Sequence, residues 1–264
     1  MTVTLREYQR EWMVGLSAKY RAGHRAVLGV APTGSGKRVA LTAAAVSAAE
    51  KGMRTCIVVH RQELLDQTTA GLMEIGVDPG IIASGFTPNR SAMIQVASAQ
   101  TLIRRTSELA ANFKFFILDE AHHSPAKTWA VIINLAPQAV IFGCTATPER
   151  LDGKGLTPPF TAMVIGPTVA ELTEQGWLSP AVVYAPAHDP DLSGVGTVAG
   201  DYNRKELVEV MGASVLIGDA VAHYRRLCDK VPAIAFCVSV RHAEAVAAQF
   251  GAAGYRSQMI EGNT

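Results

Sequence analysis

The sequence has few cysteines, and none of them are spaced like metal ligands. Its four cysteines, Cys56, Cys144, Cys228 and Cys237, lie far apart and form no CxxC pair. Three of them lie in or beside apolar runs, where a free thiol behaves as a small hydrophobic side chain. This pattern argues against a zinc site and favours a reducing compartment.

Long apolar runs and a surplus of one charge are also absent. No stretch approaches the ~18 consecutive apolar residues of a membrane span, and the start, MTVTLREYQREW, lacks the apolar core of a signal peptide. We therefore expect a soluble cytoplasmic protein that makes no membrane contact. Because the formal net charge is only +1, any contact with nucleic acid must be local.

What the sequence does contain is material for a large core. The chain has 264 residues, of which 48% are hydrophobic. It can therefore bury a sizeable core, and it is longer than one minimal domain. Short runs rich in Val, Ile and Phe alternate with longer helical patterns, at residues 26–30, 55–59, 92–97, 113–118 and 139–144. Alternating strands and helices predict an α/β fold with a parallel sheet and helices on both of its faces.

Two helices carry recognisable boundary residues. The alanine-rich run KRVALTAAAVSAAEKG follows Gly36 and closes on Gly52, a residue type suited to a left-handed cap. Ser124 and Pro125 predict another helix start, with Ser as N-cap and Pro at the first helical position.

The composition changes near residue 166, where Pro, Gly and Asp become frequent. We expect an N-terminal domain over residues 1–165, a connector over 166–204 and an incomplete second α/β domain over 205–264. The elements expected after residue 165 are helices near 168–175, 205–230 and 241–250 and strands at 232–238 and 255–260.

The segment APTGSGKR, residues 31–38, predicts a loop that binds phosphate. Gly34 and Gly36 allow successive backbone N–H groups to point at phosphate oxygens, and Lys37 would reach the β and γ phosphates. The alternative is a plain glycine turn before a helix. Position 38 normally holds a Ser or Thr whose hydroxyl ligates magnesium, but here it is Arg38.

The segment FFILDEAHH, residues 115–123, ends a buried strand with adjacent carboxylates. They would lie at the carboxyl edge of the sheet, where the phosphate loop also projects. Asp119 can hold hydrated magnesium, and Glu120 can orient or deprotonate the attacking water. Taken alone, the pair could instead be a solvated helix start.

A further strand end, GCTATPERLDG at residues 143–153, carries Thr145 and Thr147 to the same edge. Their hydroxyls could link the carboxylate site to a neighbouring domain by hydrogen bonds. As mere turn formers they would need no partner.

In this order, the motifs resemble the superfamily 2 helicases with two RecA-like domains, in the DEAD/DEAH-box group. The likeness is greatest to the RadD-like and restriction-subunit-like branch of bacteria and phages. The resembling segments are LREYQ (5–9, the adenine-reading glutamine motif), APTGSGK (motif I), HRQELLDQ (60–67, motif Ia), VASAQTL (96–102, a strand-contacting motif), DEAH (119–122, motif II), TAT (145–147, motif III), GWLSP (a connector) and AIAFCVSVRHAEAVA (233–247, motif IV).

The resemblance implies a RecA-like P-loop NTPase that uses ATP and Mg2+ and binds nucleic acid, in particular DNA, in a bacterial cell or a phage-infected host. It also implies the start of a second RecA-like domain. The implied site residues are Gln9, Pro32, Thr33, Gly34, Ser35, Gly36, Lys37 and Arg38 for the nucleotide; Lys37, Asp119, Glu120 and His122 for catalysis, with Asp119 on magnesium; Thr145 and Thr147 for coupling; and Arg61, Gln62, Ser98 and Gln100 for nucleic acid. Arg104 and Arg105 would either meet phosphates or form a solvated helix face.

Two departures limit what the resemblance implies. Arg38 cannot ligate magnesium, so we expect nucleotide to bind through the loop N–H groups and Lys37, and magnesium to rest on Asp119 and waters. No Q-x-x-G-R-x-x-R follows residue 200, so motifs V and VI are missing. The expected function is an ATP-dependent helicase or translocase. The alternative is a module that binds ATP and nucleic acid without its own turnover. Such a module would be truncated, or completed by a second chain that carries motifs V and VI. A P-loop kinase or other NTPase is disfavoured by the TATP segment.

Overall fold

The computed structural model describes residues 3–87, 89–104, 113–121, 126–148, 159–184, 191–198, 201–203, 206–207, 210 and 214–261. The chain divides into two compact units, Met1–Ala181 and Val182–Thr264, which we call unit 1 and unit 2 and describe separately. This division falls inside the connector expected over residues 166–204. The domain boundaries inferred from composition remain a prediction.

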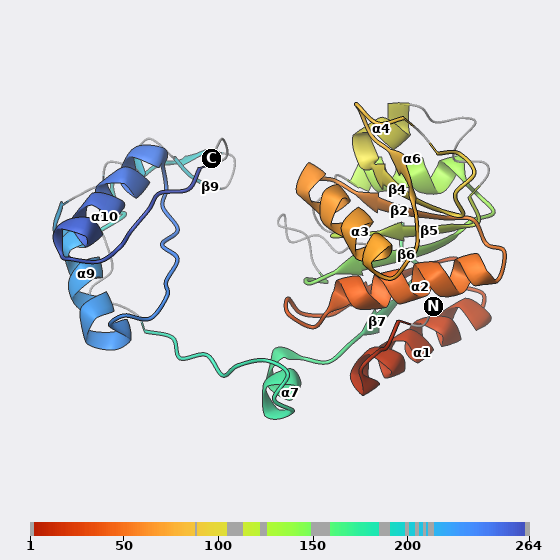
Figure 1. Ribbon diagram of the computed structural model, residues 1–264, viewed down its shortest axis with the longest axis horizontal. Coiled ribbons are helices and arrows are strands. Elements are labelled where there is room, and N and C mark those ends of the chain that lie inside the picture. The colour runs from red at the N-terminus through yellow and green to blue at the C-terminus, as the bar shows by residue number, and fades with distance from the viewer. Residues whose placement is uncertain are drawn as a thin grey trace. The chain divides into compact units, whose positions relative to one another are not determined.

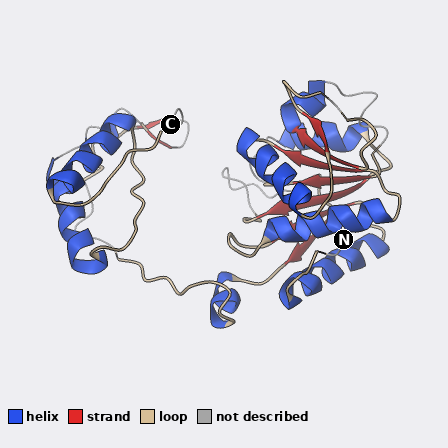
Figure 2. Ribbon diagram, in the orientation of Figure 1, coloured by secondary structure: helices blue, strands red, loops and turns tan. Residues whose placement is uncertain are grey.

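Unit 1 is built on a seven-stranded sheet in the order β3-β4-β2-β5-β6-β1-β7, and all of its strand pairs are parallel (Figure 2). The strands are β1 Ala26–Val30, β2 Thr55–Val59, β3 Gly80–Ile82, β4 Ile94–Ser98, β5 Phe115–Leu118, β6 Val140–Thr145 and β7 Ala162–Ile165. The predicted parallel α/β fold is therefore confirmed. The predictions for the five inner strands are right to within two residues at each end, but the outermost strands, β3 and β7, were not anticipated.

Helices cover both faces of this sheet, as expected (Figure 1). On one face lie α1, α2 and α3, and on the other lie α4 and α6. Their bounds are α1 Glu7–Arg21, α2 Lys37–Glu50, α3 Gln62–Glu74, α4 Ala99–Arg104 and α6 Ala126–Leu135. Trp12 and Leu16 of α1 belong to one buried cluster, whereas Leu102 of α4 and Trp129 of α6 belong to the other.

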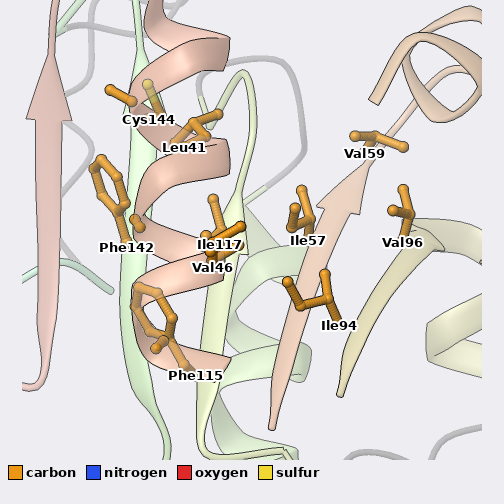
Figure 3. Close-up of a cluster of buried hydrophobic side chains, with 14 of the residues drawn as sticks. Leu41, Val46, Ile57, Val59, Ile94, Val96, Phe115, Ile117, Phe142 and Cys144 are labelled. Atoms are coloured by element: carbon orange, nitrogen blue, oxygen red, sulfur yellow. The ribbon is translucent and has the colours of Figure 1, made fainter. Parts of the chain in front are cut away.

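The strand side chains alternate between these two clusters, as a sheet buried on both faces requires. In β1, Val27 packs toward α1 and α2, whereas Leu28 packs on the opposite face. The same alternation separates Ile57 from Val58 in β2. Figure 3 shows the cluster on the α1, α2 and α3 side, to which α2 contributes Leu41 and the strands contribute side chains such as Phe142. Continuous apolar strands therefore result from burial on both sides.

The helix after the phosphate loop has the expected ends. Gly36, at φ 73°, precedes α2 in the left-handed region. Beyond the helix, Gly52 is also left-handed at φ 73°, and Met53 N–H donates to Ala48 O at 3.0 Å. These features confirm the predicted helix and its glycine cap. The predicted start at Ser124 and Pro125 lies outside the described residues.

Past β7, the short helix α7 Val169–Glu174 confirms the helix expected near residues 168–175. Thr168 caps it, accepting from Glu171 N–H at 3.2 Å, while Glu171 Oε2 accepts from Thr168 N–H at 2.7 Å. This reciprocal arrangement is a capping box, which satisfies backbone N–H groups at the start of the helix.

Unit 2 contains α9 Ser214–Cys228, α10 Val240–Ala252 and the antiparallel pair β8 Thr197–Val198 and β9 Asp201–Tyr202. The helices confirm the predicted 241–250 helix and the latter part of the 205–230 helix. Tyr224 and Phe250 join them through an edge-to-face ring contact at 5.3 Å.

The strands predicted at residues 232–238 and 255–260 are wrong, because neither segment is a strand in the structure. Ile234, Phe236 and Ile260 are 82%, 94% and 82% exposed. A strand forms by pairing with neighbours, and an isolated pair is marginal even when its residues have high β propensity. Among the described residues of unit 2, only β8 and β9 pair, so these apolar segments have no sheet to join.

No helix among the described parts of the chain combines the length and the apolar character that crossing a membrane would require.

Candidate nucleotide-binding site

The candidate residues follow strands that lie side by side. Because the strands are parallel, their carboxyl ends share one edge of the sheet. The phosphate loop follows β1, Thr145 ends the adjacent β6, and Asp119 follows β5, which is the next strand over. Backbone hydrogen bonds join these ends: Ala31 N–H donates to Thr145 O at 3.0 Å, and Ala121 N–H donates to Cys144 O at 2.8 Å. The structure therefore brings the predicted motifs I, II and III together.

Residues 31–37 form a tight loop between β1 and α2. Gly34 and Gly36 have φ of 84° and 73°, which side chains other than glycine rarely adopt. Lys37 Nζ donates to Pro32 O at 3.3 Å, so the ammonium bridges the two ends of the loop. Pro32 is half-buried and Thr33 is exposed, whereas Ser35 is buried and its Oγ has no hydrogen-bond partner within the described part of the chain. A phosphate group would fit this loop, because the ammonium and the buried hydroxyl can both donate to its oxygens.

Gln9 lies behind the loop and is buried. Its Oε1 accepts from Arg6 N–H at 3.0 Å, and its Nε2 donates to Ser35 O at 3.1 Å and to Gly36 O at 3.3 Å. Tyr8 adds a second link, since its hydroxyl donates to Ser35 O at 2.9 Å. The first turn of α1 therefore holds the phosphate loop in place.

Arg38 is exposed on the first turn of α2. Its Nη2 donates to Gln67 Oε1 on α3 at 2.6 Å. Both Arg38 and Lys37 lie close enough to Asp119 to favour its ionised form. The guanidinium thus brings positive charge to the place where a hydroxyl would ordinarily face the metal.

Asp119 and Glu120 turn away from the end of β5. Asp119 is buried, and Glu120 occupies the left-handed region at φ 51°. Asp119 Oδ1 accepts from Glu120 N–H at 3.0 Å. Burial and the adjacent Glu120 charge raise the pKa of Asp119 above its ordinary value of 3.8, while that N–H and the two cations oppose the shift. His122, the fourth predicted catalytic residue, lies outside the described residues.

Asp119 is the residue that would hold Mg2+, and the fit is partial. Magnesium in such sites uses one or two carboxylates together with waters and substrate phosphates, and Asp119 supplies one carboxylate. The second protein ligand usual for a phosphate loop, a hydroxyl at position 38, is replaced by a cation that cannot coordinate metal.

The two threonines of the third motif differ in exposure. Thr145 is fully buried, and Thr147 is exposed. Thr145 Oγ1 donates to Thr147 O at 2.8 Å and accepts from Thr147 N–H at 3.2 Å. In unit 1, the Thr145 hydroxyl therefore shapes the turn after β6, while the Thr147 side chain faces outward.

The candidate nucleic-acid residues lie on the neighbouring strands of the same edge. Arg61 and Gln62 follow β2, Ser98 ends the adjacent β4, and Gln100 lies on the first turn of α4. Gln100 Nε2 donates to His60 O at 3.3 Å, which ties the two segments together. Ser98 Oγ donates to Gln100 Oε1, and Gln62 Nε2 donates to Asp66 Oδ1. Arg104 is exposed at the end of α4, and Arg105 lies outside the described residues.

Several residues at the loop were not identified from the sequence. Tyr8 bonds to Ser35 O in the loop, and Gln67 accepts from Arg38 just after it. Leu178 approaches the loop closely, since a Cβ on Gly34 would lie 2.7 Å from Leu178 Cδ2. Tyr8 and Gln67 belong to segments that resemble family motifs, and this resemblance was the only sequence feature that pointed to them. Leu178 also belongs to such a segment, GWLSP, but it is far away in the sequence, so no local pattern could connect it to the loop.

Comparison with known proteins assigns the family. A model described as the type III restriction enzyme, res subunit, matches residues 2–150. The chain belongs to this family. The resemblance to superfamily 2 helicases of the restriction-subunit-like branch is thereby confirmed.

The chain is similar in sequence to two relatives from different organisms. It is 30% identical to a 51.5 kDa protein of a Lactococcus phage (isolate 7-9), over 88% of this chain and 48% of that protein. It is 33% identical to the DNA 3'-5' translocase XPB2 of Sulfurisphaera tokodaii, over 63% of this chain and 35% of that protein. The chain thus spans about half or less of the length of these relatives.

A solved structure agrees on the fold. The UvsW helicase from bacteriophage T4 superposes with a TM-score of 0.53 at 18% identity, over 61% of this chain and 59% of that one. At this identity the likeness concerns the fold alone, and it confirms the RecA-like class expected from the motifs.

Proposed function

We propose that the chain contributes the nucleotide-binding part of an ATP-dependent DNA helicase or translocase. The observation that carries this proposal is the single sheet edge at which the ends of β1, β6 and β5 gather the phosphate loop, Thr145 and Asp119. The same edge continues through β2 and β4 to the candidate nucleic-acid residues. A nucleotide and a nucleic-acid strand would therefore bind to adjoining parts of one rigid sheet.

In the proposed reaction, the loop N–H groups and Lys37 hold the triphosphate and offset its charge. Asp119 would hold Mg2+ through waters, and the metal would neutralise charge on the β and γ phosphates. Glu120 orients the attacking water and accepts its proton, a role that suits a carboxylate next to the phosphate site. His122 and Thr147 would couple this site to a second domain.

Nucleic acid is the proposed second ligand. Arg61 and Gln62 are exposed at the start of α3, and Gln100 is exposed on the first turn of α4. These side chains can donate hydrogen bonds to phosphate oxygens, which position a strand without reading its sequence. DNA is favoured over RNA because the relative XPB2 is named as a DNA translocase.

One observation favours the alternative, a module that binds ATP and nucleic acid without its own turnover. In the described part of unit 2, the segments expected to be strands are not strands, and Phe236 is 94% exposed. Helicases of the resembled type complete the site with arginines from a second RecA-like domain, and such an arginine is worth ~10³ to 10⁵ in rate. In this alternative, turnover would depend on arginines that another domain or chain supplies.

Hydrolysis of ATP separates these candidates. We expect turnover that single- or double-stranded DNA stimulates and that disappears in Glu120→Gln, which serves as the blank. Turnover indistinguishable from the blank, with nucleotide still bound, would reject the independent motor and support the incomplete module. Transfer of phosphate to an acceptor substrate would contradict both.

A further inference from the structure

The guanidinium of Arg38 is held by a neutral partner. Arg38 lies on the first turn of α2, directly after Lys37, and its Nη2 donates to Gln67 Oε1 on the second turn of α3 at 2.6 Å. Both Arg38 and Gln67 are exposed. Among the residues that the structure describes, this is the one hydrogen bond of the Arg38 side chain, and no carboxylate forms an ion pair with it. The positive charge of Arg38 is therefore available to an anionic ligand.

This charge stands at the edge of the sheet where the triphosphate is proposed to bind. In the sheet order, β5 and β6 lie between β2, which α3 follows, and β1, which α2 follows. A contact between the first turns of α2 and α3 therefore lies near the end of β5, which Asp119 follows. Burial raises the pKa of Asp119, and the charges of Arg38 and Lys37 oppose this rise. Both cations are thus close to that carboxylate while Gln67 holds Arg38.

The bond to Gln67 leaves most of the guanidinium available. A guanidinium has five N–H donors in a planar fork, and the contact with Gln67 occupies one side of a single nitrogen, Nη2. The fork matches phosphate, to which it can donate two parallel hydrogen bonds. Arg38 can therefore bind Gln67 and a phosphate group at the same time, and the contact with Gln67 does not have to break.

The terminal phosphates are the part of the ligand that Arg38 would meet. Arg38 directly follows the loop at residues 31–37, and its neighbour Lys37 is proposed to hold the β and γ phosphates. Asp119, which lies near Arg38, is the carboxylate proposed to face the same phosphates. A guanidinium at position 38 would offset negative charge on those oxygens.

Gln67 restricts a long side chain before any ligand arrives. An exposed arginine loses rotamer freedom when it binds a ligand, and this loss reduces affinity. The bond of 2.6 Å from α2 to α3 already limits that freedom in the Arg38 side chain. Preorganisation of this kind increases affinity without a new contact to the ligand. Gln67 can therefore act on the nucleotide without touching it.

We infer that Arg38 binds the terminal phosphates of the nucleotide directly and that Gln67 is a positioning residue, which holds the guanidinium in place for them. The inference rests on the proposed function, because it requires the triphosphate to lie in the loop at residues 31–37. It goes beyond that proposal, in which the loop N–H groups and Lys37 hold the triphosphate. Because the contact is to phosphate, the contribution of Gln67 should be the same with and without Mg2+.

A double-mutant cycle measured by isothermal titration tests this inference, with inorganic tripolyphosphate as the probe in EDTA. We expect Gln67→Ala to raise the Kd by about two- to tenfold, the range that corresponds to one net hydrogen bond, and Arg38→Ala to raise it by at least roughly tenfold. In the Arg38→Ala background, Gln67→Ala should have no further effect, since Gln67 acts through Arg38.

The control is Gln138→Ala, which removes an exposed glutamine amide from the turn before β6, at the amino edge of the sheet. It should leave the Kd unchanged. ATP should show the same factors as tripolyphosphate, and Mg2+ should leave the factor for Gln67→Ala unchanged. A change confined to ATP would place the effect at the nucleoside and overturn the inference.

Other outcomes separate the inference from its premise. A Kd that is unchanged or lower in Gln67→Ala, or an equal loss with and without Arg38, would overturn the positioning role while leaving the loop intact as a phosphate site. An unchanged Kd in Arg38→Ala would overturn the direct contact. Failure of the unmodified chain to bind either ATP or tripolyphosphate would overturn the proposed function and the inference together.

A second measurement uses the unmodified chain. The side-chain amide NMR signal of Gln67, identified by its absence in Gln67→Ala, reports on the bond to Arg38. Tripolyphosphate should shift this signal, because phosphate would polarise the guanidinium that the amide contacts. The same addition should leave the Gln67 signal of Arg38→Ala and the Gln138 signal of either chain in place. A Gln67 signal that does not respond to bound tripolyphosphate would contradict the inference.

Discussion

Arg38 on the first turn of α2 and Gln67 on α3 are joined by a hydrogen bond of 2.6 Å from the guanidinium Nη2 to the amide Oε1. This contact links the helix that follows the phosphate loop to the helix that begins at the candidate nucleic-acid residues Arg61 and Gln62. It also directs the Arg38 head group toward Gln67 at the position where a metal-binding hydroxyl would otherwise stand. The magnesium requirement of this site should therefore be unusually small.

Arg38→Thr should restore a hydroxyl ligand and increase that requirement. We expect the ratio of the ATP Kd in EDTA to the Kd in Mg2+ to grow by at least roughly tenfold, the scale on which changes around a metal ligand act. Gln67→Ala, which removes the partner and keeps the guanidinium, should leave the ratio closer to that of the unmodified chain. An unchanged magnesium requirement and unchanged turnover in Arg38→Thr would show that position 38 does not govern the metal.

Asp119→Asn should abolish turnover and yet stabilise the fold. Burial, followed by the Glu120 charge, raises the pKa of Asp119 above its ordinary value of 3.8. The native state then binds more protons than the unfolded state, so ionisation of Asp119 lowers stability above the raised pKa and has no effect below the ordinary one. At neutral pH in EDTA, the variant should gain roughly 1 kcal/mol in urea unfolding.

The gain from Asp119→Asn should shrink as the pH falls from the raised pKa toward 3.8. Asp78→Asn, at an exposed carboxylate of unit 1, provides the control and should show no such gain. A gain that is absent at neutral pH, or that grows on acidification, would contradict the proposed cost of burying Asp119.

Arg61→Ala should weaken DNA binding equally for unrelated sequences. Each phosphate contact contributes about 0.7 to 0.9 to the slope of log affinity against log salt, so the slope should become shallower by about that amount. Arg21→Ala is the control. Arg21 is exposed at the end of α1, shortly before the amino end of β1, which is the edge of the sheet opposite the candidate site. A loss of affinity that follows DNA sequence and ignores salt would reject backbone contact by Arg61.

Gly29→Ala tests the packing that carries the site. An added Cβ would lie 2.6 Å from Trp12 Cζ2 and 2.7 Å from Phe142 Cε2, both in the buried face beneath α1. Overpacking of this kind costs about 1–3 kcal/mol in urea unfolding. Gly71→Ala, in α3 with nothing within 4 Å of the new Cβ, should instead stabilise the fold by up to about 1 kcal/mol. Equal effects of the two substitutions would contradict the close contact at Gly29.

The sequence was sufficient to predict the inner sheet because burial on both faces leaves a local signature. β1 and β2 match the apolar runs at residues 26–30 and 55–59, since every residue in them is buried. β7 was missed because it lies at the sheet edge, where residues such as Ile165 are 70% exposed and the apolar run is short. β3 is also an outer strand, with only three residues.

The need of a strand for a hydrogen-bonded neighbour explains the strand predictions that were wrong. The segment 232–238 contains the strand formers Ile234, Phe236 and Val238, but no strand among the described residues pairs with it, and sequence alone does not reveal whether a neighbour exists. The same limit applies at the candidate site. Residue types and order predicted which strand ends meet, whereas the engagement of Gln9 by the loop and the contact of Leu178 with Gly34 depend on three-dimensional proximity.

The most direct test of the account is the affinity of the chain for ATP before and after removal of the Lys37 ammonium. We expect Lys37→Ala to raise the Kd by at least about tenfold, because a charge-assisted contact to phosphate is lost. Lys51→Ala removes an exposed lysine just beyond the other end of α2 and should leave the Kd unchanged. The same Kd in Lys37→Ala and in the unmodified chain would show that residues 31–38 are not the nucleotide site, and the account of this chain as a nucleotide-driven motor would fail.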